Sequence, residues 1–160
     1  MSATVGSNAP DFTLPNQDRQ AVTLSAAAGK NVVLAFFPAA FTSVCQKELC
    51  YFRDQLANLN SANATVYGIS VDTPFTLKEF AKQNALPFDL LSDFNKDAIT
   101  KYDVVNPDML GLKGISKRAV FVIDGSGVIR HREATASPGE EPNYQLVHEA
   151  LAAIEGGVGA

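Results

Sequence analysis

The chain has 160 residues, a length that suits one domain rather than two. Hydrophobic residues make up 46% of it, enough for a sizeable core, and the net charge is −4, with 13 basic residues scattered among 17 acidic ones. Because no Lys/Arg-rich run with interleaved aromatic residues occurs, we expect no nucleic-acid-binding groove. We expect a single domain over residues 1–160, in which residues 155–160 form a glycine-containing, frayed tail.

The start of the chain shows no basic segment followed by an apolar stretch of signal-peptide length. The longest strongly apolar run, residues 32–37, is too short to cross a bilayer. We therefore expect a soluble protein of the cytoplasm, or of an equivalent reducing compartment, that does not associate with a membrane.

Apolar periods and turn residues predict strands and helices that alternate along the chain. Residues 22–24 are a short strand candidate, and residues 31–37 are nearly all apolar, as in a strand covered on both faces. Apolar residues then recur at near-helical spacing over residues 42–59, and Ser43 with Gln46, or Thr42 instead, can cap that helix.

The pattern continues with a second buried strand over residues 65–71. Asp72 and Thr73, followed by Pro74, then begin a helix that runs to about residue 84. The remaining predicted elements are a helix over residues 96–102, strands over residues 119–124 and 128–131 joined by a glycine-containing turn, and a final helix over residues 143–154. This order predicts an α/β, thioredoxin-like fold: a mixed central sheet with helices on both faces and an N-terminal β extension. A fold alone does not give a function.

The only two cysteines, Cys45 and Cys50, lie close together in the sequence. In a reducing compartment, a close pair is more often catalytic or metal-binding than a permanent disulfide. A zinc site needs about four ligands, and the two histidines, His131 and His148, are far away and show no ligand spacing. We therefore favour thiol chemistry and expect neither a metal nor a cofactor.

Cys45 lies where a buried strand is followed by a helix, in the first helical turn. The unpaired backbone N–H groups and the positive end of the helix dipole favour a thiolate there. Thr42, three residues earlier, can direct its hydroxyl at the same space and hold a peroxide oxygen against the sulfur. Pro38 has no N–H donor and a rigid φ, so it can form a wall beside the sulfur. We expect this sulfur to be ionised and open to small oxidants.

Pro38, Thr42 and Cys45 form the pattern Pro-x-x-x-Thr-x-x-Cys, and here the sequence resembles the peroxiredoxin family. The resemblance is greatest to the AhpE and PrxQ (bacterioferritin-comigratory) branches and covers nearly the whole chain. Matching segments outside the motif are residues 9–14, 36–38, 90–93 and 121–124.

The resemblance implies further site residues and a reaction. Arg118, just before a predicted strand, occupies the place of a family arginine that stabilises the thiolate and polarises the peroxide O–O bond. Glu48 matches an acidic residue of several branches and is expected to orient an arginine. Cys45 then attacks hydrogen peroxide or an organic hydroperoxide and becomes a sulfenic acid. The implied partners are these peroxides and a thioredoxin- or glutaredoxin-like reductant.

Cys50 is the candidate that condenses with the sulfenic acid, because the PrxQ branch often has a resolving cysteine at this spacing. The AhpE branch generally lacks it, so the sequence combines features of both. In an intact helix, residues i and i+5 lie roughly 8–9 Å apart at Cα, whereas a disulfide needs less than about 7 Å. We therefore expect the first one or two turns of the helix to unwind if a Cys45–Cys50 disulfide forms.

Other interpretations remain open. Cys50 could be an inward-packed helix residue, Arg118 a surface arginine, and Glu48 an ordinary acid of the first helical turns. The chain could be a one-cysteine peroxidase that an external thiol resolves directly, a thiol–disulfide oxidoreductase, or a redox-sensing binding protein. The lack of a Cys-x-x-Cys pair argues against the oxidoreductase. The family often forms dimers, so a homodimer is one expectation that no motif here tests.

Overall fold

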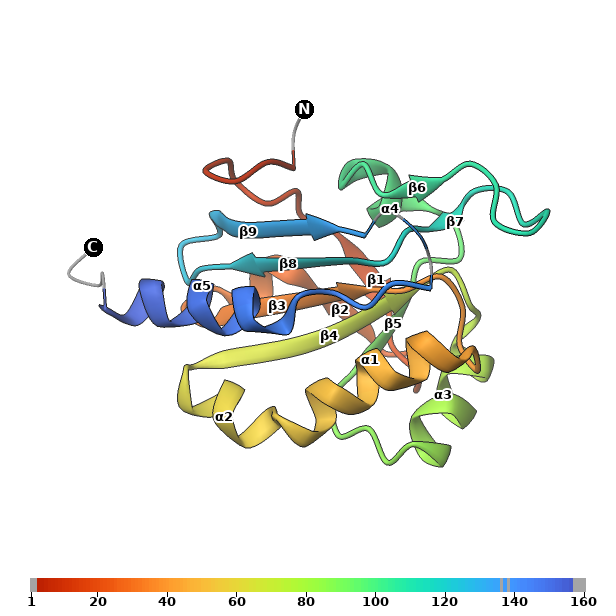
Figure 1. The fold of residues 1–160 in the computed structure, drawn as a ribbon, viewed down its shortest axis with the longest axis horizontal. Helices are drawn as coiled ribbons and strands as arrows, with labels where there is room; N and C mark the ends of the chain where they lie inside the picture. Colours follow the sequence, from red (N-terminus) through yellow and green to blue (C-terminus); the bar gives the residue numbers. More distant parts are fainter. Residues whose placement is uncertain (1–2, 136, 138, 157–160) are drawn as a thin grey trace.

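The computed structural model describes residues 3–135, 137 and 139–156, and a five-stranded mixed sheet forms its centre (Figure 1). In spatial order the strands are β5 (Leu90–Ser92), β4 (Ala64–Ser70), β3 (Asn31–Phe36), β8 (Ala119–Ile123) and β9 (Ile129–Ala134). The first three run parallel, whereas β8 is antiparallel to both of its neighbours. Every residue of β3 and β8 is buried, which explains their continuous apolar sequences.

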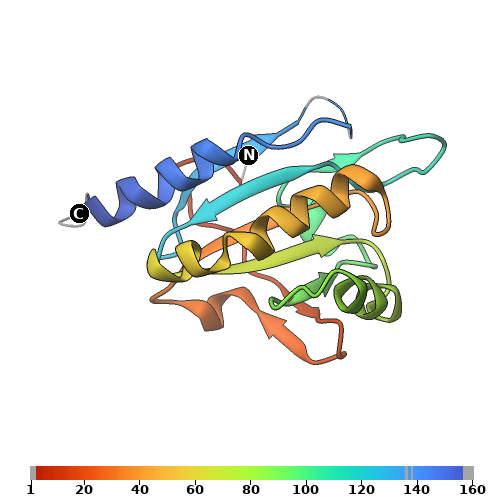
Figure 2. The same ribbon diagram turned by 60° about the horizontal axis from the view of Figure 1, so that its bottom comes forward.

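Helices cover both faces of this sheet (Figures 1 and 2). One face packs against α1 (Ser43–Asp54), α2 (Leu56–Ser61), α3 (Pro74–Gln83) and α5 (Tyr144–Gly156). The other face is covered by the N-terminal segment, the 3-10 helix η1 (Leu24–Ala27) and α4 (Asp97–Lys101). The alternating side chains of β3 divide between the two cores: Val33 and Ala35 face the first, and Leu34 and Phe36 the second.

Two small antiparallel ribbons complete the fold. β1 (Thr13–Pro15) pairs with β2 (Ala21–Thr23), and β6 (Val105–Asn106) pairs with β7 (Ile115–Ser116). The first ribbon is the predicted N-terminal β extension. The thioredoxin-like fold, with its mixed sheet between two layers, is thereby confirmed. Within the residues described, no helix has both the length and the apolar character needed to cross a membrane.

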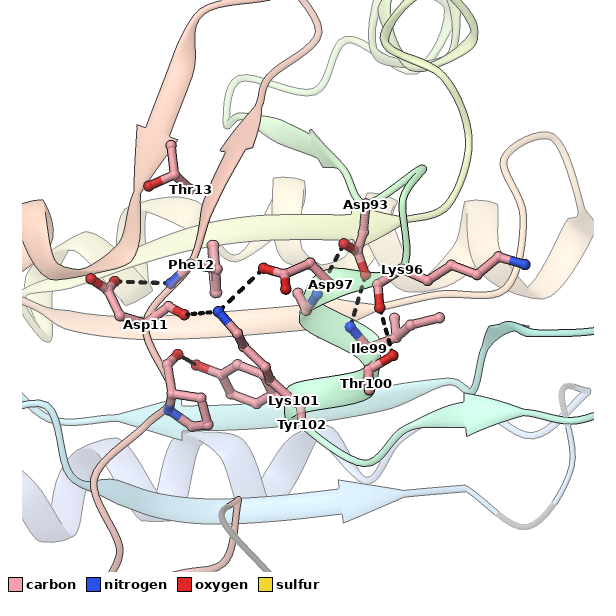
Figure 3. Close-up of polar contacts among 12 residues, drawn as sticks. Asp11, Phe12, Thr13, Asp93, Lys96, Asp97, Ile99, Thr100, Lys101 and Tyr102 are labelled. Atoms are coloured by element: carbon pink, nitrogen blue, oxygen red, sulfur yellow. Dashed lines mark hydrogen bonds and ion pairs between the residues drawn. The ribbon is translucent and has the colours of Figure 1, made fainter.

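The N-terminal segment is fastened to α4 by polar contacts, which Figure 3 shows. The hydroxyl of Tyr102 donates to the carbonyl of Pro10 at 2.6 Å, and Lys101 donates to the carbonyl of Asp11 at 3.0 Å. The carboxylate of Asp93 accepts two backbone N–H groups from the first turn of α4. The ring of Tyr102 is buried in the second core, so these contacts hold the N-terminal segment against that core.

Several details differ from the sequence-based expectations, beginning with Leu24, which was predicted in a strand and begins η1 instead. The helix predicted over residues 42–59 is interrupted at Gln55, which ends α1 and precedes α2. Apolar spacing does not reveal this break, because Phe52 before it and Leu59 after it are both buried in the same core. Residues 90–92 form the edge strand β5, too short to show a period of its own. The last helix continues to Gly156, so residues 155 and 156 are helical rather than frayed, and residues 157–160 lie outside the described part of the chain.

Candidate active site

The candidate nucleophile lies at the carboxyl end of the central strand β3. Phe37 still donates its N–H to the carbonyl of Ile69 at 2.9 Å, and the buried Pro38, which has no N–H to offer, then ends the strand. Helix α1 begins at Ser43, and Cys45 is its third residue. The backbone N–H groups of this first turn have no partner within the helix, so they present partial positive charge to the sulfur.

The side chain of Arg118, which is distant in the sequence, meets those of Cys45 and Glu48, which lie one turn apart on α1. Arg118 donates from Nη2 to Sγ of Cys45 at 3.2 Å and from Nη1 to Oε1 of Glu48 at 2.8 Å. The exposed fraction is 0% for Cys45 and Glu48 and 2% for Arg118. The register of the sheet explains the meeting, because Ala119 pairs with Phe36 and thereby places Arg118 beside the end of β3.

Burial determines the electrostatics of this cluster. It raises the pKa of Glu48 to about 8, although Arg118 opposes the shift and only the charges of Glu141 and Glu133 add to it. Burial alone would lower the pKa of Arg118, but the negative charges of Glu48 and Cys45 outweigh it and raise that pKa. Burial thus has a larger effect on the pKa of the carboxyl group than the opposing ion pair with Arg118. The less negative charge Glu48 carries, the more of the guanidinium charge is directed at the sulfur.

Thr42 occupies the N-cap position of α1, but its hydroxyl does not cap the helix. It donates instead to the carbonyl of Ala39 at 2.8 Å. The capping box predicted for Ser43 and Gln46 is likewise not formed among the described residues, and the N–H of Gln46 bonds to the carbonyl of Thr42 at 2.9 Å. The oxygen of the Thr42 hydroxyl is therefore available as an acceptor, since its single proton is already used.

A pocket of about 190 Å³ opens beside this cluster. Its lining comprises Pro38, Thr42, Ser43, Val44, Met109, Leu110, Arg118 and Gly139. Cys45 is not part of the lining, and its side chain is fully buried. The expectation of a sulfur open to oxidants is thus wrong for this conformation: the pocket reaches Thr42 and Arg118, and the sulfur lies behind them.

Cys50 lies elsewhere along the same helix. Its Sγ is 3.6 Å from Oδ1 of Asn84, the residue that follows α3, and both cysteines are free thiols. Arg53 donates to the carbonyl of Asn84 at 2.7 Å, which keeps this junction of α1 and α3 in place. The structure therefore brings Pro38, Thr42, Arg118 and Glu48 to Cys45, but it does not bring Cys50 there.

Two groups of residues at the site were not anticipated from the sequence. The carboxylate of Asp72, which was expected to help begin α3, accepts the N–H of Ala40 at 2.8 Å, whereas Thr73 is the N-cap residue. Met109 and Leu110, on the connection between β6 and β7, line the pocket. The sequence offers no signal for either contact, because both join segments that are distant along the chain. Among the described residues, no cluster of His, Cys, Asp and Glu could hold a metal ion.

Comparison with known proteins agrees with this geometry. Residues 5–132 match the AhpC/TSA family. The chain is 44% identical to alkyl hydroperoxide reductase E of Mycobacterium tuberculosis over 153 residues, 94% of this chain and 97% of that protein. It is 41% identical over 132 residues to a putative peroxiredoxin bcp of Coxiella burnetii, 81% of this chain and 87% of that protein.

Solved structures show the same relationship. The crystal structure of the peroxidoxin BcpB from Mycobacterium tuberculosis superposes with a TM-score of 0.82 at 30% identity, covering 96% of this chain and 97% of that one. A peroxiredoxin-like protein from Aquifex aeolicus gives a TM-score of 0.87 at 28% identity, covering 96% and 89%. From the family match, the relatives and the fold together, we conclude that the chain belongs to the AhpC/TSA family and is a peroxiredoxin, a thiol-dependent peroxidase.

Proposed function

We propose that Cys45 is the nucleophile that reduces hydrogen peroxide and organic hydroperoxides. The observation that carries this assignment is the buried guanidinium of Arg118, which donates to the Cys45 sulfur at 3.2 Å in the first turn of α1. A cation and a helix N-terminus directed at one sulfur stabilise a thiolate, and a thiolate is the reactive form. Cys50, in contrast, lies against the neutral amide of Asn84.

The surrounding groups suit attack on a peroxide. The oxygen of Thr42 can accept the peroxide O–H, because its own proton is donated to Ala39. Arg118 lines the pocket and can donate to the peroxide oxygens as the O–O bond polarises. Val44, Met109 and Leu110 add apolar surface, which suits the organic part of an alkyl hydroperoxide. Since Cys45 lies behind the lining, a small opening of this wall must precede contact with the substrate.

The chemical step balances without a cofactor. A lone pair of the Cys45 thiolate attacks the terminal peroxide oxygen in line with the O–O bond. The S–O bond forms, the O–O bond breaks, and the leaving alkoxide or hydroxide takes a proton and departs as alcohol or water. Cys45 is then a sulfenic acid, which a thiol converts to a disulfide with release of water. An external thioredoxin- or glutaredoxin-like reductant, in a reducing compartment such as the cytoplasm, returns the cysteine to its thiol form.

Cys50 is our first candidate for the thiol that reacts with the sulfenic acid. Both cysteines lie within the continuous helix α1, where positions i and i+5 are roughly 8–9 Å apart at Cα. A disulfide requires less than about 7 Å, so the start of α1 must unwind after oxidation. The contact of Cys50 with Asn84 supports a second candidate, in which an external thiol attacks Cys45 directly and Cys50 keeps its place beside α3.

Replacement of the nucleophile tests the assignment. Cys45→Ser should abolish peroxide consumption in the presence of dithiothreitol, whereas Cys50→Ser should still consume the first equivalent. Far-UV circular dichroism of both variants should match that of the wild type. Peroxide turnover by Cys45→Ser would exclude Cys45 as the nucleophile.

A further inference from the structure

Asp72 holds the loop that carries the catalytic threonine. Its Oδ2 accepts two hydrogen bonds, from the N–H of Ala40 at 2.8 Å and from the hydroxyl of Ser70 at 2.7 Å. Its own N–H donates to Oγ of Ser70 at 3.1 Å, and its carbonyl accepts the hydroxyl of Ser92 at 2.6 Å. The carboxylate is therefore oriented by β4 and β5 and reaches across to the segment between β3 and α1. Thr73 caps α3, so Asp72 is not needed for that purpose.

One peptide unit connects Asp72 to Thr42. The N–H of Ala40 and the C=O of Ala39 belong to the same planar group, and in a trans peptide they point in opposite directions. When Asp72 holds the N–H, the carbonyl on the other side is held toward Thr42, whose hydroxyl donates to it at 2.8 Å. Carboxylate, peptide and hydroxyl thus form one chain of hydrogen bonds, in which each bond polarises the next.

The backbone between these groups is strained. Phe41 has φ of 67°, the left-handed region that residues other than glycine rarely adopt. Such a conformation persists only where the surroundings impose it. The ring of Phe41 lies edge-on to Phe80 with centroids 5.2 Å apart, and the Asp72 contact holds the preceding residue. We expect that loss of that contact would let the turn relax and release the Thr42 hydroxyl from Ala39.

We propose that Asp72 is a positioning residue for peroxide reduction. Through the Ala39–Ala40 peptide, it keeps the proton of the Thr42 hydroxyl in a hydrogen bond to the carbonyl of Ala39, and it thereby leaves the Thr42 oxygen to accept the O–H of the substrate. This role rests on the function proposed above for Cys45 and Thr42. It is distinct from a general contribution to folding, since it affects a reaction that uses the Thr42 hydroxyl and spares one that does not.

The test compares two reactions of the same sulfur. The first is reduction of hydrogen peroxide, and the second is alkylation of Cys45 by iodoacetamide, which has no O–H for Thr42 to accept. Trypsin cleaves after Lys47 and places Cys45 and Cys50 on separate peptides, so mass spectrometry follows each alkylation alone. Asp72→Ala should lower the peroxide rate constant about tenfold without slowing alkylation of Cys45.

Two further variants sharpen the comparison. In Asp72→Asn, the amide oxygen can still accept from both Ala40 and Ser70, so the peroxide rate should stay within about twofold of the wild type. Thr42→Val should lower it about 100-fold, and Asp72→Ala added to Thr42→Val should cost less than about twofold more, because both changes remove the same contribution. The exposed Asp18→Ala is the matched control and should leave both rates unchanged.

Specific outcomes would overturn the role of Asp72. They are an unchanged peroxide rate in Asp72→Ala, a parallel fall of both rates, or full additivity with Thr42→Val. If Asp72→Ala does not fold, Ser70→Ala removes one partner of the same carboxylate and should lower the peroxide rate about threefold without slowing alkylation; no effect there would overturn the role equally. A wild-type protein that consumes no peroxide would instead contradict the proposed function itself.

Discussion

Arg118 donates to the sulfur of Cys45 at 3.2 Å, although 73 positions separate the two residues in the chain. The same guanidinium also binds Glu48, four-tenths of an ångström closer, at 2.8 Å. A single cation is thus shared between the proposed nucleophile and a carboxyl group, and all three side chains are buried. The state of the carboxyl group consequently decides how much positive charge is directed at the sulfur.

Replacement of Arg118 should affect the chemistry strongly. Arg118→Met removes the cation that faces the sulfur and that would stabilise the charge developing on the peroxide oxygens. We therefore expect the rate constant for peroxide reduction to fall about 100- to 1,000-fold. Arg118→Lys should recover only part of it, because an ammonium cannot donate to Cys45 and Glu48 with the planar geometry of a guanidinium. Stopped-flow measurement of peroxide loss checks both. Lys117→Met is the control at the neighbouring position, and a comparable fall there would contradict the assignment.

Stability should depend on pH through Glu48. Its pKa is raised from 4.5 to about 8 by burial, so the folded state keeps a proton that the unfolded state loses. The free energy of unfolding should therefore decrease as pH rises from about 5 to 8, with a limiting slope of about 1.4 kcal/mol per pH unit, and level off above that. Glu48→Gln has no proton to lose, so its stability relative to the wild type should increase over the same range.

Urea denaturation of both proteins at pH 5, 7 and 8.5 measures this difference. A wild-type stability that stays constant between pH 5 and 8 relative to Glu48→Gln would show that Glu48 is already charged in the folded state over this range. In that case the ion pair with Arg118, rather than burial, would dominate the site.

The fate of Cys50 after oxidation separates the two routes of resolution. With one equivalent of hydrogen peroxide and no reductant, intact mass spectrometry of the wild type should show the loss of two hydrogens that accompanies an internal disulfide. Cys50→Ser should show the addition of one oxygen instead. Hydrogen exchange in the first turns of α1 should increase in the oxidised wild type, because the helix must unwind to join the two sulfurs. A persistent sulfenic acid in the wild type would favour direct attack by an external thiol.

The choice of peroxide should depend on Leu110. This side chain is 94% exposed and lines the pocket, so an organic hydroperoxide can cover it whereas hydrogen peroxide cannot. Leu110→Ser should lower kcat/KM for cumene hydroperoxide about threefold to tenfold and leave that for hydrogen peroxide unchanged. Leu112→Ser, on the same connection but outside the pocket lining, serves as the control. Equal effects of Leu110→Ser on the two substrates would contradict this use of the apolar wall.

The local pattern of the sequence was sufficient for the elements that build the site. A nearly all-apolar run predicted the buried strand β3, and helical spacing after it placed Cys45 in a first turn, as the structure confirms. These features depend on residues within one or two turns of each other, which is the range over which backbone periodicity acts. The resemblance in Pro38, Thr42 and Cys45 supplied the chemistry, and it pointed correctly to the family.

The tertiary structure decided how the groups around the sulfur meet, although the family resemblance had already pointed to Arg118 and Glu48. The antiparallel pairing of β8 with β3 places Arg118 beside Cys45. The packing of α1 against the sheet buries Glu48, and this burial raises the pKa of its carboxyl group. The reach of Asp72 to Ala40 likewise depends on the parallel pairing of β4 with β3. Desolvation and contacts between distant segments arise only when the chain is packed, so no local pattern encodes them. Cys45 as a candidate nucleophile and its distance from Cys50 along the helix could therefore be predicted from the sequence, whereas the burial of its sulfur and the contact of Cys50 with Asn84 required the folded molecule.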